Sequence, residues 1–87
     1  MHELSLLNAL IKKLHEVAAE SGGKRVLAVK VRLGALSHFS PAHFREHFVL
    51  ASKGSLAEGA RLDVRLMDDE QDPDAQAVVL ESIECEV

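Results

Sequence analysis

The hydrophobic period of the chain changes once near its start, and that change fixes the kind of fold the chain can adopt. From Leu4 to Glu20 the apolar residues recur every three or four positions, as on one face of an amphipathic helix. Ser21-Gly22-Gly23 then supplies the glycine that suits a helix end. From Lys24 to Leu33 the period becomes two, with Leu27, Val29, Val31 and Leu33 on the apolar side. The chain must therefore pack a helix against a strand that buries one face.

The remaining segments predict one more helix and two more strands. Ser40-Pro41 is typical of a helix start, with Ser40 as N-cap and Pro41 in the first turn. Lys53-Gly54 ends that helix. Apolar residues alternate with polar ones from Ala60 to Met67, and a last strand is predicted from Ala77 to Val87.

The element order predicts an α+β fold, with two helices packed on one face of a three-stranded mixed sheet. The order is helix, strand, helix, strand, strand, in one domain that spans residues 1–87. The first two strands should be parallel and joined by a right-handed crossover through the second helix. Asp68 to Asp74 holds five acids and one proline in seven residues, so we expect a solvated loop. That loop should join the last two strands as antiparallel neighbours.

Composition limits the partners and the compartment. The 87 residues carry a net charge of −4 and no cluster of Lys and Arg, which argues against a nucleic-acid partner. No apolar run approaches the roughly 20 residues that cross a membrane, and Glu3, Lys12 and Lys13 interrupt any signal-peptide core. Cys85 is the single cysteine and cannot form an internal disulfide, so we expect a cytoplasmic protein.

Met1-His2-Glu3 places several metal donors in one short peptide. The donors are the α-amine of Met1, the backbone nitrogen and imidazole of His2, and the carboxylate of Glu3. Amine, deprotonated amide and imidazole from adjacent residues close small chelate rings around one ion. Such an in-plane set of nitrogens suits Ni(II) or Cu(II) better than Zn(II), which prefers a tetrahedron. The alternative is an ordinary solvated histidine.

The other histidines form a second candidate set. His43 and His47 are four residues apart in the predicted second helix, a spacing that can place two imidazoles on one metal. The alternative is two solvated helix histidines, and the pattern is not His-Glu-x-x-His because Glu46 directly precedes the second histidine. His38 could approach the same end of that helix, or lie in a loop. His15 is predicted to be a surface residue of the first helix.

No group predicts catalysis. Ser37 and Ser40 have histidines nearby in sequence but no nucleophile motif, and there is no glycine-rich phosphate loop, so we expect no enzyme activity. The acids of residues 68–74 could hold Ca²⁺ or loosely bound Ni²⁺, but they lack the spacing of a calcium loop. Cys85 should share an apolar face with Ile83 and be buried as a small hydrophobic residue.

Four separated segments resemble the HypA/HybF family of hydrogenase nickel-incorporation proteins. They are Met1-His2-Glu3-Leu4-Ser5-Leu6, Lys30-Val31-Arg32-Leu33-Gly34-Ala35-Leu36-Ser37, Lys53-Gly54-Ser55-Leu56-Ala57-Glu58-Gly59-Ala60, and Glu81-Ser82-Ile83-Glu84. The resemblance implies a nickel metallochaperone. Its ligands would be the imidazole and backbone nitrogen of His2, the α-amine of Met1, and the backbone nitrogen or carboxylate of Glu3. Its partners would be a HypB-type GTPase and the large subunit of [NiFe]-hydrogenase or, in some organisms, urease.

The chain departs from this family in one respect. Family members carry a zinc-binding domain, built on two Cys-x-x-Cys pairs, between the last two strands. Here an acidic loop, residues 68–76, takes that place, and no Cys-x-x-Cys exists. We therefore expect Ni(II) but no structural zinc. The chain is either a natural short form or the product of an excision.

Two alternatives to the metallochaperone remain. One is a HypA-like adaptor that carries no metal and docks on the GTPase or on a full-length paralogue. The other is a small enzyme that uses His43 and His47. A three-stranded sheet also leaves exposed edges, through which a homodimer could form.

Overall fold

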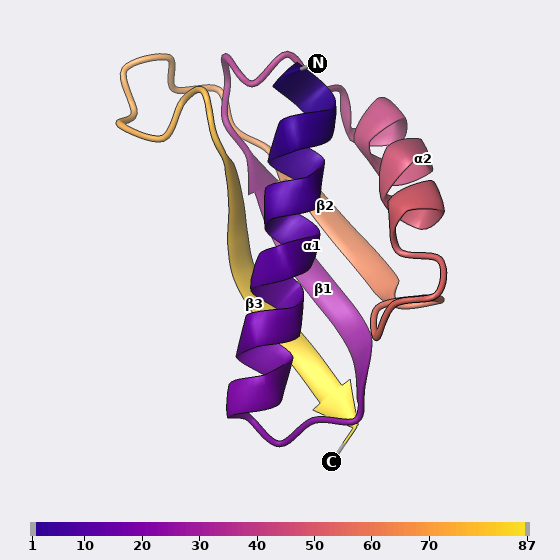
Figure 1. Cartoon of the computed structure of the whole chain (residues 1–87). Coiled ribbons are helices and arrows are strands. Elements are labelled where there is room, and N and C mark those ends of the chain that lie inside the picture. The colour runs from indigo at the N-terminus through magenta and orange to yellow at the C-terminus, as the bar shows by residue number, and fades with distance from the viewer. Residues whose placement is uncertain (1, 87) are drawn as a thin grey trace.

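The computed structural model describes residues 2–86, with the side chains of residues 5–86. Along the chain the elements are α1 (His2–Glu20), β1 (Arg25–Leu33), α2 (Pro41–Ala51), β2 (Arg61–Leu66) and β3 (Val78–Glu86). The predicted element order and the α+β class are confirmed. Figure 1 shows both helices on the same side of the sheet, with α1 running along it and α2 beside α1. None of the described helices is long and apolar enough to cross a membrane.

The apolar stripe of α1 faces the sheet, as its period predicted. Leu7, Leu10, Leu14 and Ala18 are all buried. The helix ends through Gly22, whose φ of 68° is the left-handed geometry that glycine adopts without a steric penalty. A short turn then leads into β1, so α1 and β1 run antiparallel over similar lengths.

The central strand of the sheet is β1, because the strand order is β2-β1-β3. It pairs in parallel with β2 and antiparallel with β3. The predicted parallel pair is confirmed, but the prediction that the last two strands are neighbours is wrong. The physical reason is that β1 is the most apolar strand, with Val26, Val29, Val31 and Leu33 each at most 1% exposed. The central strand of a sheet has a neighbouring strand on both edges. β3 lies at an edge of this sheet, and none of its described side chains is more than half-buried.

The acidic connection between β2 and β3 packs on the sheet, which corrects the expectation of a wholly solvated loop. It crosses the end of β1, where Gly34 N donates to Ala77 O (2.9 Å) and Leu36 N donates to Ala75 O (2.7 Å). Ala75 is only 5% exposed, and a Cβ on Gly34 would overlap its carbonyl. The acidic residues themselves stay exposed or half-exposed. The connection, residues 67–77, is thus a strap that crosses one end of the sheet. It is long enough to pass over the central strand β1 and reach the far edge.

One irregularity changes which β1 side chains face the core. The period of two predicted that Leu27 is buried, but it is 42% exposed while its neighbour Val26 is 1% exposed. The pairing with β3 shifts between Val26 and Ala28, which is a β-bulge that inserts one residue. The alternation is therefore interrupted at Leu27 and resumes at Val29.

The second helix is fixed at its start and along its inner face. Ser40 is the N-cap and its hydroxyl accepts a hydrogen bond from His43 N (3.1 Å), as predicted. Phe44 and Phe48 are buried in the core. Arg45 Nη1 donates to the carbonyl of Leu62 in β2 (2.8 Å), which ties the helix to an edge strand.

Candidate metal centre

Two of the three predicted nickel-binding residues, His2 and Glu3, fall at the first turn of α1. The helix begins at His2, so the backbones of His2 and Glu3 belong to it. Met1 lies outside the described residues, and so do the side chains of His2 and Glu3. The first backbone N–H groups of a helix have no carbonyl partner within the helix. The backbone N–H groups of His2 and Glu3 therefore make no hydrogen bond within the helix. Coordination of a metal by these backbone nitrogens would break no helical hydrogen bond.

The start of α1 lies at the same end of the molecule as the start of α2 (Figure 1). Because α1 runs antiparallel to β1, the first turn of α1 lies at the end of the sheet where β1 ends at Leu33. Residues 34–40 leave β1 at that end and lead into α2. Leu7 of α1, Phe39 of this connection and Phe44 of α2 are all buried in one core cluster. The leading peptide is thus attached to a packed part of the fold.

His43 and His47 lie side by side on α2. Their ring centroids are 4.4 Å apart, and the ring planes are inclined by 38°. His43 is exposed and His47 is half-buried. The spacing in the sequence predicted this shared face, and the structure confirms it.

The remaining histidines stand apart from this pair. His38 is exposed, with a φ of 66°, a left-handed conformation that few residues other than glycine adopt. His15 is half-buried on α1, less exposed than predicted. Among the side chains that the structure describes, no three from His, Cys, Asp and Glu are grouped to hold a metal ion. The acidic connection and Cys85 therefore belong to no such group. Cys85 packs against the core, as does Ile83, but it is only half-buried and thus less buried than predicted.

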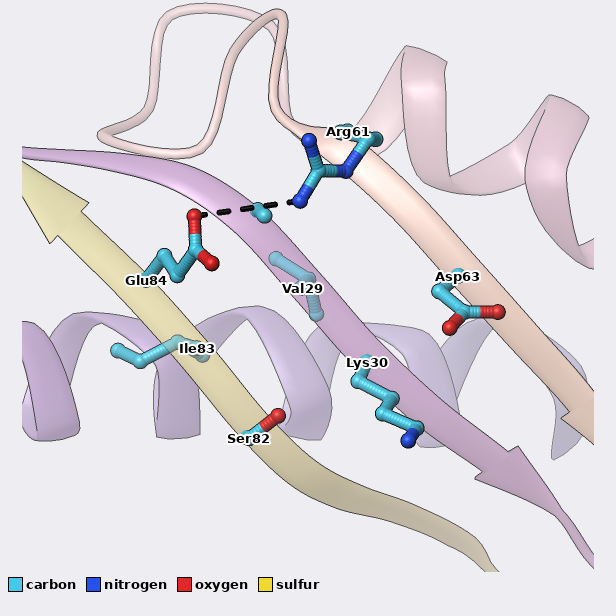
Figure 2. Close-up of a pocket in the computed structure, with 8 residues that line it drawn as sticks. Val29, Lys30, Arg61, Asp63, Ser82, Ile83 and Glu84 are labelled. Atoms are coloured by element: carbon cyan, nitrogen blue, oxygen red, sulfur yellow. Dashed lines mark ion pairs between the residues drawn. The ribbon is translucent and has the colours of Figure 1, made fainter.

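A shallow hollow marks the open face of the sheet (Figure 2). It forms at Ala28, whose small side chain lies in register between Arg61 of β2 and Glu84 of β3. The side chains of Arg61 and Glu84 meet across it, with Arg61 Nη2 3.9 Å from Glu84 Oε2. The hollow measures ≈ 160 Å³. Ligand pockets usually measure about 300–1,000 Å³, so this face is a poor site for a small molecule.

Comparison with known proteins shows the family to which the chain belongs. Residues 1–72 match the family described as hydrogenase/urease nickel incorporation, metallochaperone, hypA. The chain belongs to the HypA family. The matched range includes the leading tripeptide, α1 and the histidine pair of α2.

Two HypA relatives show how much of a full-length member the chain represents. It is 41% identical over 64 residues to the hydrogenase maturation factor HypA of Archaeoglobus fulgidus, which covers 74% of this chain and 58% of the relative. It is 36% identical over 67 residues to that of Methylocella silvestris, which covers 77% of this chain and 59% of the relative. The matched part thus spans less than three fifths of the length of either relative.

The fold of this HypA-family chain is also found in a solved structure. The solution structure of the Ni metallochaperone HypA from Helicobacter pylori superposes with a TM-score of 0.79, over 98% of this chain and 97% of that one. At 20% sequence identity the match shows the shared fold. It extends the likeness beyond residue 72, into β3.

Proposed function

We propose that this chain is the nickel-binding unit of a hydrogenase maturation factor, which holds Ni(II) at Met1, His2 and Glu3 and delivers it without catalysing a reaction. The family match over residues 1–72, which contains the leading tripeptide, is the observation that carries the proposal. Both relatives described above are hydrogenase maturation factors, which supports hydrogenase as the destination.

The chemistry of the donors suits a square set of nitrogens. The α-amine of Met1 and the backbone nitrogen of His2 close one chelate ring, and the His2 imidazole closes the next. The fourth position falls to the backbone nitrogen or carboxylate of Glu3. The positive end of the α1 dipole opposes a cation at this place, so binding needs anionic donors. A deprotonated amide or the Glu3 carboxylate supplies that charge.

Transfer then proceeds by ligand exchange. The donors belong to three consecutive residues, and an acceptor can replace them one at a time. Protons compete for the same nitrogens, and an imidazole has an ordinary pKa of about 6.5. Nickel affinity therefore falls as the pH is lowered through that range. We propose a HypB-type GTPase and the hydrogenase large subunit as partners, with urease as an alternative destination.

A structural zinc site of the usual kind does not enter this proposal. Such sites use four Cys or His ligands around one ion, at least two of them cysteines. The chain has one cysteine, and its connection between β2 and β3 is the strap that ends at Ala77. The nickel unit would therefore act without the stabilisation that zinc contributes to a metal-dependent domain.

A nickel titration of the untagged protein tests the proposal. Calorimetry should show one submicromolar site in the native sequence, and His2→Ala should weaken it by about 100-fold or more. His15→Ala is the matched control, because it removes a helix histidine elsewhere on α1, and it should bind like the native chain. Equal, weak binding by the native protein and His2→Ala would contradict the proposal and favour the metal-free adaptor.

A further inference from the structure

We propose that His43 and His47, which lie side by side on α2, form a second metal site that takes one divalent late first-row ion such as Ni(II). It does not depend on the site proposed at the start of α1. Its ligands are two imidazoles, and water fills the other coordination positions.

The spacing of the two rings fits one ion. Two nitrogens at about 2.1 Å from a metal, in adjacent coordination positions, lie roughly 3 Å from each other. The ring centroids of His43 and His47 are already 4.4 Å apart, so rotation about the side-chain torsions is enough to bring two ring nitrogens to that separation. Residues at positions i and i+4 of a helix lie on one face, which keeps both rings in reach of the ion.

Packing of α2 against the core fixes the backbone that carries the two histidines. Phe44 and Phe48, each next in sequence to one of the two histidines, are buried in the core. The N-cap at Ser40 and the hydrogen bond from Arg45 to Leu62 fix the start and the side of α2. Both imidazoles are thus carried by a rigid element, and binding a metal costs little ordering of the backbone.

The environment predicts a labile site. Within the described part of the chain no third His, Cys, Asp or Glu joins the pair. Imidazole is a suitable ligand for Ni(II), Cu(II) and Zn(II), and two of them alone give moderate affinity that should be higher for Cu(II) than for Ni(II). Open positions allow rapid exchange with another ligand. The starts of α1 and α2 lie at the same end of the molecule (Figure 1).

The test uses the full chain with the leading site removed. Ni(II) is titrated into His2→Ala, and into the same background carrying His43→Ala, His47→Ala or the control His15→Ala. We expect the His2→Ala protein to keep one site in the micromolar range. Either α2 substitution should weaken it about tenfold or more, because chelation needs both rings. The His15→Ala control should leave it unchanged.

A spectroscopic readout locates the ion. With two imidazoles and water as ligands the nickel is paramagnetic, so amide NMR signals of α2 should broaden in His2→Ala and remain sharp when His47 is also replaced. Circular dichroism confirms that each variant is folded. The proposal is overturned if His2→Ala binds no nickel, or if both α2 variants bind as it does. The comparison of the native chain with His2→Ala reports the leading site separately, so failure of one site is distinguishable from failure of the other.

Discussion

The two faces of the sheet differ in burial and in their contribution to stability. The face under the helices is apolar, and Leu14, Val31 and Phe44 there are completely buried. The open face carries charges on neighbouring strands, and the paired side chains of Arg61 and Glu84 are 76% and 68% exposed. Burial of apolar surface is the main source of stability, whereas an exposed ion pair contributes little. Stability therefore rests on one face only.

Among the side chains that the structure describes, neither face of the sheet carries a group of three metal ligands, and the proposed metal sites lie on the helices. Residues 2 and 3 begin α1 at one end of the sheet, and the histidine pair lies on α2, whose buried residues are Phe44 and Phe48. Replacing His2, His43 or His47 should thus change metal binding without changing the fold. The following predictions test the contrast between the faces, beginning with the largest effect.

Phe44→Ala should break the covered face. Removing a fully buried phenylalanine costs about 3–5 kcal/mol of the free energy of unfolding, through lost burial and the cavity left behind. Urea denaturation followed by circular dichroism measures it. Val49→Ala, on the same helix but 55% exposed, is the control and should change stability by less than about 0.5 kcal/mol. Similar losses in both variants would show that the covered face does not dominate.

Gly34→Ala should disturb the strap that crosses the end of β1. The added Cβ would overlap the backbone of Ala75, so the strap must move, at a cost of about 3 kcal/mol. Gly22→Ala is the control: nothing lies near the new Cβ, and only its left-handed φ costs about 1 kcal/mol. A smaller loss for Gly34→Ala than for Gly22→Ala would mean that the strap does not pack against β1.

The ion pair of the open face should be nearly neutral. A double-mutant cycle with Arg61→Ala and Glu84→Ala should give a coupling energy below about 0.5 kcal/mol, since both partners are well solvated. The free energies of unfolding come from the same urea titrations, repeated at low and high salt. A coupling above 1 kcal/mol that persists at high salt would place a second stability centre on this face.

Ser37→Ala should have the smallest effect of all. Its hydroxyl is buried and has no hydrogen-bond partner within the described part of the chain, so its removal leaves no other group unpaired. We expect a change within about 0.5 kcal/mol, of either sign, by urea denaturation. A loss above 1 kcal/mol would reveal a partner for this hydroxyl that the described residues do not include.

Local patterns predicted much of this fold, and tertiary pairing accounts for what they missed. The period of α1, the N-cap at Ser40 and the parallel pair of β1 and β2 all follow from short-range rules. The position of β3 depends on which strand has two covered edges, and a local pattern does not encode that. The bulge at Leu27 arises from the register of β1 with β3, so the local pattern of β1 could not predict it either.

The candidate sites show the same limit. The spacing of His43 and His47 was enough to place both rings on one side of α2, because a helix fixes that geometry. The leading tripeptide was found from donor chemistry and family resemblance, not from a period. That α1 and α2 start at the same end of the molecule follows from the path of α1 along the sheet, which only the assembled fold reveals.

Anomalous diffraction from a crystal of the untagged protein soaked in Ni(II) would locate the ion at the start of α1. We expect nickel within coordination distance, about 2 Å, of the His2 imidazole and the Met1 amine, and a weaker second peak between His43 and His47. Nickel on α2 alone, or elsewhere with nothing beside His2, would contradict this expectation.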